Sequence, residues 1–232
     1  MIRLVVGLGN PGKEYERTRH NAGFWLVERF AQANGIALRK DPKFKALVGK
    51  REGGAASGST FFVLPQSFMN ASGQPVQMLA GFFRIKPEEM LVVHDELDFA
   101  PGVARIKQGG GIAGHNGLKD ISQRVASHDY WRLRIGIGHP GDKDVVADYV
   151  LHKPSVEDKA AIDQAIDRAL QVMPELLGGD MQAAIQKLHS GEPKPAEKKE
   201  PPKKEVPIKE PEKKEPEPQK SGGLLKSLFG KK

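Results

Sequence analysis

Short apolar runs alternate with helix-spaced apolar residues along most of this chain. Five segments are predicted as strands, because they are apolar throughout or alternate apolar with polar positions: residues 2–8, 60–64, 90–93, 103–107 and 131–137. Helices are predicted where apolar residues return every three or four positions: 21–34, 74–83, 118–125 and 155–189, the last broken in two around Gly178 and Gly179. Strands that alternate with helices predict the α/β class, here a single globular domain with a mixed, largely buried central sheet flanked by helices.

The composition changes abruptly after Ser190. Residues 191–220 are almost entirely Pro, Lys and Glu, and so polar a segment cannot bury enough apolar surface to offset the entropy of ordering it. We therefore predict a globular domain over 1–190, a disordered linker over 191–220 and a short basic amphipathic segment over 221–232. On a helix this end segment would place four large apolar side chains beside three lysines, so its partner is left open between a membrane surface, another protein and none.

Charge and cysteine content narrow the class of protein. The formal net charge is +7, of which +3 lies in residues 1–190, +1 in 191–220 and +3 in 221–232. RNA binding by the domain would therefore depend on local clusters of basic residues. The chain has no cysteine, which excludes disulfides and a cysteine nucleophile. The sequence shows neither a signal-peptide pattern nor an apolar run of bilayer length, so we expect a cytoplasmic protein.

Polar residues stand where the predicted strands end, at the edge where open α/β sheets bind ligands. Asn10 and Asn70 follow two of these strands, and Asp95 stands at the end of the strand predicted over 90–93. His20 lies in the loop after the first strand, and an imidazole titrates near neutral pH, so His20 suits a general base that Asp95 would orient. Without a cysteine or a Gly-x-Ser-x-Gly turn, the nucleophile of such a pair is water.

Four segments together resemble the bacterial-type peptidyl-tRNA hydrolases: residues 5–24, 65–70, 94–98 and 109–118, within a colinear match from about residue 1 to 189. The resemblance implies a monomeric enzyme that hydrolyses the ester between a peptide and the 3′ ribose of tRNA, without a metal or organic cofactor, and so frees tRNA for reuse. It implies that His20 and Asp95 are catalytic and that Lys107 and Arg134 clamp the terminal phosphate of tRNA. It assigns substrate binding to Asn10, Tyr15, Phe68, Asn70 and Asn116.

Three other interpretations stay open on the residues alone. The Gly-rich turn 7–12 could hold a dinucleotide, although Pro11 interrupts the expected glycine spacing. A non-catalytic RNA-binding module would keep the fold without the reaction. A metal site is the third, although no zinc-binding spacing is present; its ligands would be His94, Asp95, Glu96, Asp98 and His115.

The sequence departs from the usual pattern of this family at one place. Ile112 and Ala113 stand where a glycine commonly precedes the Gly-His-Asn sequence of residues 114–116. The methyl group of Ala113 restricts the backbone, so the conformation of this loop is the local feature that the resemblance leaves undetermined.

Overall fold

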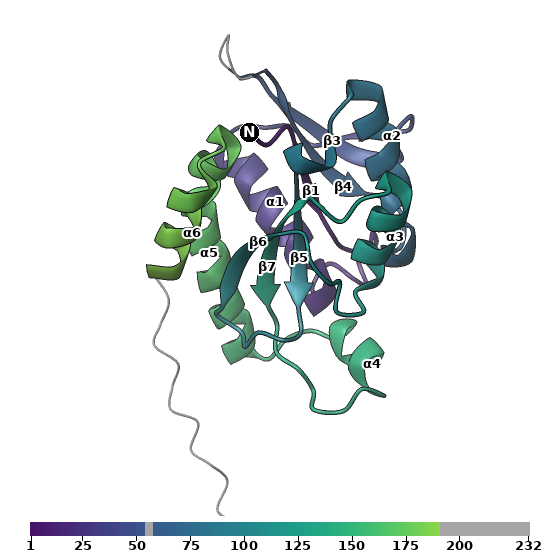
Figure 1. Ribbon diagram of the computed structural model, residues 1–232. Helices are drawn as coiled ribbons and strands as arrows, with labels where there is room; N and C mark the ends of the chain where they lie inside the picture. Colours follow the sequence, from purple (N-terminus) through teal and green to yellow (C-terminus); the bar gives the residue numbers. More distant parts are fainter. Residues whose placement is uncertain (54–57, 191–232) are drawn as a thin grey trace, which may run out of the picture. The chain divides into compact units, whose positions relative to one another are not determined.

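A seven-stranded sheet organises the residues that the computed structural model describes, 1–53 and 58–190 (Figure 1). Its strand order is β2-β3-β4-β1-β5-β7-β6. The four central strands β4, β1, β5 and β7 are parallel, whereas β2, β3 and β6 pair antiparallel at the two edges. The strands are β1 (Leu4–Gly7), β2 (Arg39–Asp41), β3 (Ala46–Arg51), β4 (Thr60–Pro65), β5 (Met90–Glu96), β6 (Ala104–Gln108) and β7 (Trp131–Gly136).

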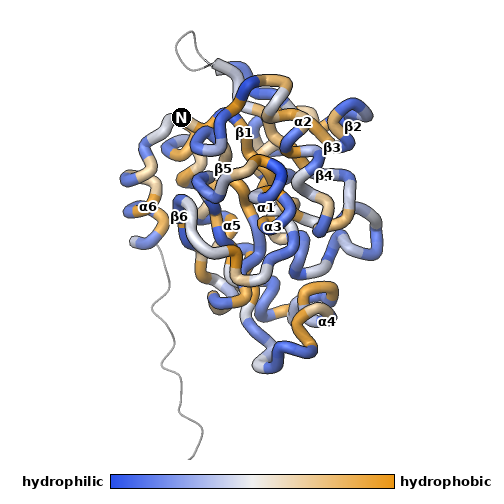
Figure 2. Tube along the Cα trace, turned by 45° about the vertical axis from the view of Figure 1, so that its right-hand side comes forward, coloured by the Kyte–Doolittle hydropathy of each residue, from blue (hydrophilic) through white to orange (hydrophobic). Residues whose placement is uncertain are grey.

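Helices cover both faces of the sheet, and Figure 2 shows the apolar strands enclosed between them. Helices α1 (Ala22–Ala33), α5 (Val156–Gly178) and α6 (Met181–Ser190) pack on one face, and α2 (Gly73–Phe83) and α3 (Asn116–Val125) pack on the other. The short helices are α4 (Val146–Val150) and the 3₁₀ turns η1 (Arg19–Asn21), η2 (Met69–Ala71) and η3 (Pro87–Glu89). The predicted α/β class and the mixed, buried sheet are therefore confirmed.

All the predicted strands and helices are present, with shifted ends. The strand predicted at 90–93 continues to Glu96, because its last three residues pair with β7 from Arg134 to Gly136. The pair of helices at 155–189 is confirmed, and Gly179 ends α5 with a left-handed backbone.

Besides the 3₁₀ turns, two strands and one α-helix were not predicted. The edge strand β2 and its neighbour β3 carry Arg or Lys at their exposed positions, so their hydrophobic pattern is weak. Helix α4 has only five residues, too few for a helical period to show.

The carboxyl ends of β1, β4 and β5 lie side by side, since these strands are parallel neighbours. The loops that follow them hold Asn10, Asn70 and Asp98, and Figure 1 shows α4 at this same end of the sheet.

Residues 191–232, which include the predicted linker and end segment, lie outside the described residues. Among the described residues, no helix is long and apolar enough to cross a membrane.

Two glycines test how tightly α1 and α2 pack. A Cβ on Gly23 would lie 2.3 Å from the carbonyl oxygen of Val93 and 2.5 Å from the amide nitrogen of Leu8. Gly23→Ala should lower the free energy of unfolding by roughly 1–3 kcal/mol, because backbone atoms cannot move aside. Gly81→Ala, in α2 with no atom within 4 Å, should raise it by about 0.5–1 kcal/mol. Chemical denaturation measures both, and equal effects would contradict this packing.

Candidate active site

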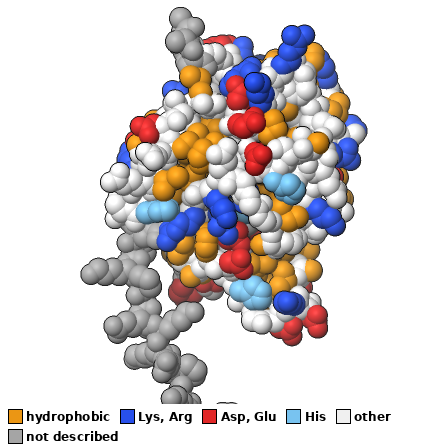
Figure 3. All heavy atoms as spheres, in the orientation of Figure 1, with side chains coloured by type: hydrophobic (Ala, Val, Ile, Leu, Met, Phe, Trp, Pro, Cys, Tyr) orange, Lys and Arg blue, Asp and Glu red, His pale blue; other side chains and the backbone are white. Residues whose placement is uncertain are grey.

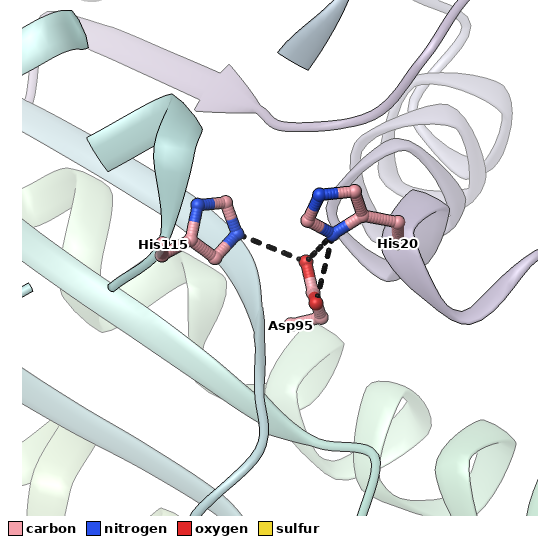
Figure 4. Close-up of side chains that lie close together, drawn as sticks. All are labelled: His20, Asp95 and His115. Carbon is pink, nitrogen blue, oxygen red and sulfur yellow. Dashed lines mark hydrogen bonds and ion pairs between the residues drawn. The ribbon is translucent and has the colours of Figure 1, made fainter. Parts of the chain in front are cut away.

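A buried carboxylate, that of Asp95, joins two histidines from different elements (Figure 4). His20 Nδ1 lies 3.0 Å from both oxygens of Asp95, and His115 Nε2 lies 3.0 Å from Oδ1. The Asp95 side chain is 2 % exposed, against 12 % for His20 and 8 % for His115. The two imidazoles therefore replace the water that a carboxylate at the end of β5 would otherwise need.

The hydrogen bonds of His115 fix where its proton lies. His115 is the N-cap of α3, and its Nδ1 accepts from the backbone N–H groups of Gly117 and Leu118 at 3.2 and 3.4 Å. A nitrogen that accepts carries no proton, so Nε2 carries it and donates to Asp95. His115 is thus held as a donor to the carboxylate and is not available as a base.

His20 has the opposite arrangement. Its Nδ1 faces Asp95, and Figure 4 shows its second ring nitrogen, Nε2, pointing away from the carboxylate. Burial lowers the pKa of His20, but the charge of Asp95 and its hydrogen bond raise it by more, so the pKa lies above 6.5. His20 can therefore take a proton at Nε2 while Asp95 supports the charged ring.

His94, beside Asp95 in the sequence, is a neutral neighbour. Its Nδ1 lies 2.6 Å from the carbonyl oxygen of Asp95, and its Nε2 is buried without a partner among the described residues. Burial, reinforced by His115, lowers the pKa of His94 to about 3. The same neighbourhood holds the pKa of Asp95 well below its usual value, because its two histidines outweigh the effect of burial.

Three asparagines approach His20, from the loops after β1 and β4 and from the start of α3. Asn10 Oδ1 accepts from the backbone N–H of Met69 at 2.7 Å, and its backbone exchanges two hydrogen bonds with the Asn21 side chain. This leaves Nδ2 of Asn10 to donate. Asn70 and Asn116 are exposed, and their side-chain amides have no partner in the described part of the chain. The site thus offers neutral donors near the base.

Two cavities meet at His20. The larger, about 650 Å³, extends along Glu96 and Asp98 to His139 and Lys143. The smaller, about 260 Å³, is lined by nine residues besides His20, none of them charged: Asn10, Tyr15, Phe68, Met69, Asn70, Asn116, Ala147, Val150 and Leu151. The rings of Tyr15 and Phe68 meet edge to face there, 6.1 Å apart.

Basic side chains gather over β6 and β7, as Figure 3 shows. The pairing sets Lys107 opposite Arg132 and Arg105 opposite Arg134, so all four lie on one face of this strand pair, with Lys107 and Arg134 diagonal neighbours. Arg134 Nε donates to Glu96 at 2.9 Å, and its guanidinium lies 4.3 Å from the centre of the Phe99 ring. Glu96 and Phe99 thus hold Arg134 beside the larger cavity.

A buried arginine holds the Gly-rich loop between β6 and α3. Arg132, 3 % exposed, donates to the carbonyl oxygen of Gly109 and, at 2.6 Å, to that of Gly111. Further along this loop, Ala113 has a φ of 46°, a left-handed backbone that a glycine adopts more easily. The departure from the family pattern therefore costs some strain but leaves His115 and Asn116 in the site.

The structure also bears on the metal and dinucleotide interpretations. Within the described ranges, one group of three possible metal ligands occurs, His20, Asp95 and His115, whose ligand atoms all lie within 4.8 Å. It omits three of the five residues considered from the sequence, and hydrogen bonds already join its members. In the turn 7–12, a dinucleotide site would need a helix to start within the motif, whereas α1 begins at Ala22.

Three residues with a part in the site were missed in the sequence. The sequence indicates His115 only as a possible metal ligand and gives no role to Asn21 or Arg132. His115 had a signal, since it precedes a predicted helix as an N-cap would. Asn21 and Arg132 act through partners 11 to 23 residues away, which no local pattern indicates.

Comparison with known proteins gives one consistent family. The family described as peptidyl-tRNA hydrolase matches residues 4–199. A peptidyl-tRNA hydrolase of Thiobacillus denitrificans is 55% identical over 197 residues, 85% of this chain and 93% of the relative. One of Nitrosospira multiformis is 51% identical over 82% of this chain and 98% of the relative. The crystal structure of peptidyl-tRNA hydrolase from Acinetobacter baumannii has a TM-score of 0.78 and 46% identity, over 83% of this chain and 97% of that one.

The raised pKa of His20 can be measured directly. Following its ring by NMR across pH should give a midpoint above 6.5 in the unaltered protein. Asp95→Asn removes the charge that raises the pKa but keeps the burial that lowers it, so the midpoint should fall below 6.5. Asp163→Asn, on the outer helix α5, is the control and should leave it unchanged. A midpoint that stays high in Asp95→Asn would show that another group sets it.

Proposed function

Because this chain belongs to the peptidyl-tRNA hydrolase family, it is a hydrolase of peptidyl-tRNA, and we propose that His20 activates the water that cleaves the ester. Nε2 of His20 takes a proton from water, and the hydroxide attacks the carbonyl carbon that joins the peptide to the 3′ ribose. The tetrahedral intermediate collapses, the ribose oxygen leaves with the proton from His20, and free peptide and free tRNA result.

The shared hydrogen bonding of Asp95 is the observation that carries this proposal. A base must be oriented and its charged form stabilised, and the contacts of His20 with both carboxylate oxygens at 3.0 Å supply both. Binding RNA without catalysis does not require a buried carboxylate between two imidazoles. That alternative is therefore the weaker one.

The neutral amides suit the negative charge that develops on the carbonyl oxygen. Nδ2 of Asn10, with the side chains of Asn70 and Asn116, can donate to it, and Asn116 begins α3, where the helix dipole favours negative charge. The smaller cavity has no carboxylate among its lining residues to balance a free α-ammonium, so we place the acyl group there and expect N-blocked aminoacyl groups to be preferred.

Lys107 and Arg134 are the proposed clamp for the terminal phosphate of tRNA. Their diagonal positions on β6 and β7 point two cations to one side of the sheet. Since only Nε of Arg134 is bonded to Glu96, both Nη groups can bind phosphate oxygens as a fork. The substrate is made on ribosomes, so we also place the enzyme in the cytoplasm, and we expect it to act as a monomer.

Removing the base tests the mechanism. His20→Ala should lower kcat for N-acetyl-aminoacyl-tRNA roughly 10²- to 10⁴-fold, the usual contribution of a positioned base. Release of free tRNA gives the rate, and circular dichroism checks the fold. His128→Ala, an exposed histidine outside both cavities, should be as active as the unaltered protein. Near-normal turnover by His20→Ala would rule His20 out as the base.

The phosphate clamp has a different kinetic signature. Lys107→Ala and Arg134→Ala should each raise KM by roughly tenfold and leave kcat nearly unchanged, because a charge-assisted contact worth about 1.4 kcal/mol is lost in ground and transition states alike. The effect should shrink on tRNA without its terminal phosphate. Lys50→Ala is the charge-matched control, because β3 lies near the other edge of the sheet from β6 and β7. A loss confined to kcat would instead place these residues in the chemistry.

A further inference from the structure

The residue before His20 is a buried arginine that ties two distant segments together. The Arg19 side chain is 9 % exposed. Its Nη1 donates to the carbonyl oxygens of Tyr149, His152 and Lys153, at 3.5, 3.3 and 2.8 Å. Its Nη2 lies 3.3 Å from Oδ2 of Asp158, in the first turn of α5. One guanidinium therefore joins η1 to the end of α4 and to the start of α5.

Two further contacts strengthen this link. The Arg19 backbone N–H donates to the carbonyl oxygen of His152 at 3.2 Å, so main chain and side chain grip the same segment. The guanidinium also lies 4.0 Å from the centre of the Tyr149 ring, whose hydroxyl donates to the carbonyl oxygen of Ile137 at 2.8 Å. A guanidinium is suited to this task because its planar fork can serve several carbonyls and a carboxylate at once.

The segment so held forms part of both cavities. Ala147 and Val150, on α4, line the larger and the smaller cavity, as do His20 and Asn116. Helix α4 has five residues, and a helix this short is not stable by itself, so its position depends on tertiary contacts. Arg19 supplies several of these contacts from a position directly next to the base.

We propose that Arg19 is a positioning residue that holds α4 over His20 and thereby sets the shape of the two cavities that meet there. The proposal rests on the function proposed above, in which His20 is the base. Arg19 does not touch substrate, because its two Nη groups bond protein carbonyls and Asp158, and its Nε is buried without a partner among the described residues. Its effect is on substrate binding, while the hydrogen bonds of His20 with Asp95 stay as they are.

Conservative and neutral substitutions test this. Arg19→Lys keeps the charge but cannot reach three carbonyls and a carboxylate together, and Asp158→Asn removes only the ion pair. We expect kcat/KM of Arg19→Lys to fall roughly 10- to 100-fold, mainly through KM, and that of Asp158→Asn to fall less. Arg29→Lys is the matched control, because Arg29 also pairs with two α5 carboxylates, those of Asp163 and Asp167, but lies away from α4.

Hydrogen exchange gives a readout that does not depend on activity. In Arg19→Lys, amides of residues 146–153 should exchange at least fivefold faster, while those of β5 and the NMR midpoint of His20 stay as in the unaltered protein. Unchanged exchange over 146–153, or a loss in kcat with a shifted His20 midpoint, would overturn the proposal. If Arg19→Lys unfolds, β5 will exchange faster too, and Asp158→Asn then decides by the same two measurements. Failure of His20 as the base would show instead as an active His20→Ala protein.

Discussion

The charge on Asp95 constrains the whole site, because a carboxylate removed from water costs several kcal/mol unless donors replace the water. His20 and His115 are those donors, and they belong to different elements, η1 and the start of α3. The three elements can therefore pack only in an arrangement that brings both imidazoles to the end of β5. The arrangement that neutralises the carboxylate is also the one that orients His20.

His115 and His20 show how one carboxylate can serve two identical side chains differently. The amides at the start of α3 occupy Nδ1 of His115, so its proton stays on Nε2. Within the described residues no group bonds Nε2 of His20, whose Nδ1 faces the carboxylate. The division of labour between the two histidines is therefore set by backbone N–H groups and not by the histidines themselves.

Buried arginines hold the loops around this centre. Arg132 binds carbonyl oxygens of the Gly-rich loop that leads to His115. Arg19 binds carbonyl oxygens of the segment that follows α4 in the sequence. Loops have few backbone partners of their own, and a guanidinium with several donors can satisfy many carbonyls from one position. Both loops are thus fixed by long-range contacts.

Much of this could be predicted from the sequence, because it depends on local pattern. Apolar runs such as 60–64 and helical spacing such as 21–34 determined the α/β class, and chemical type with position after a strand indicated His20, Asp95 and Asn10 as site residues. The sequence does not predict strands β2 and β3, whose pattern is weak, or the five-residue α4. Their stability comes from neighbouring elements and not from their own periodicity.

What only the tertiary structure decided is which groups meet. Asp95 is 75 residues from His20 and 20 from His115, and Arg19 is 130 to 134 residues from the carbonyls that it binds. No local pattern indicates contacts between residues so far apart in the sequence, because the parallel strand order and the packing of loops bring these residues together. The sequence by itself determined which chemical groups are available to this protein. Contacts between residues distant in the sequence decided the tautomer of His115, the pKa of His20 and the position of α4.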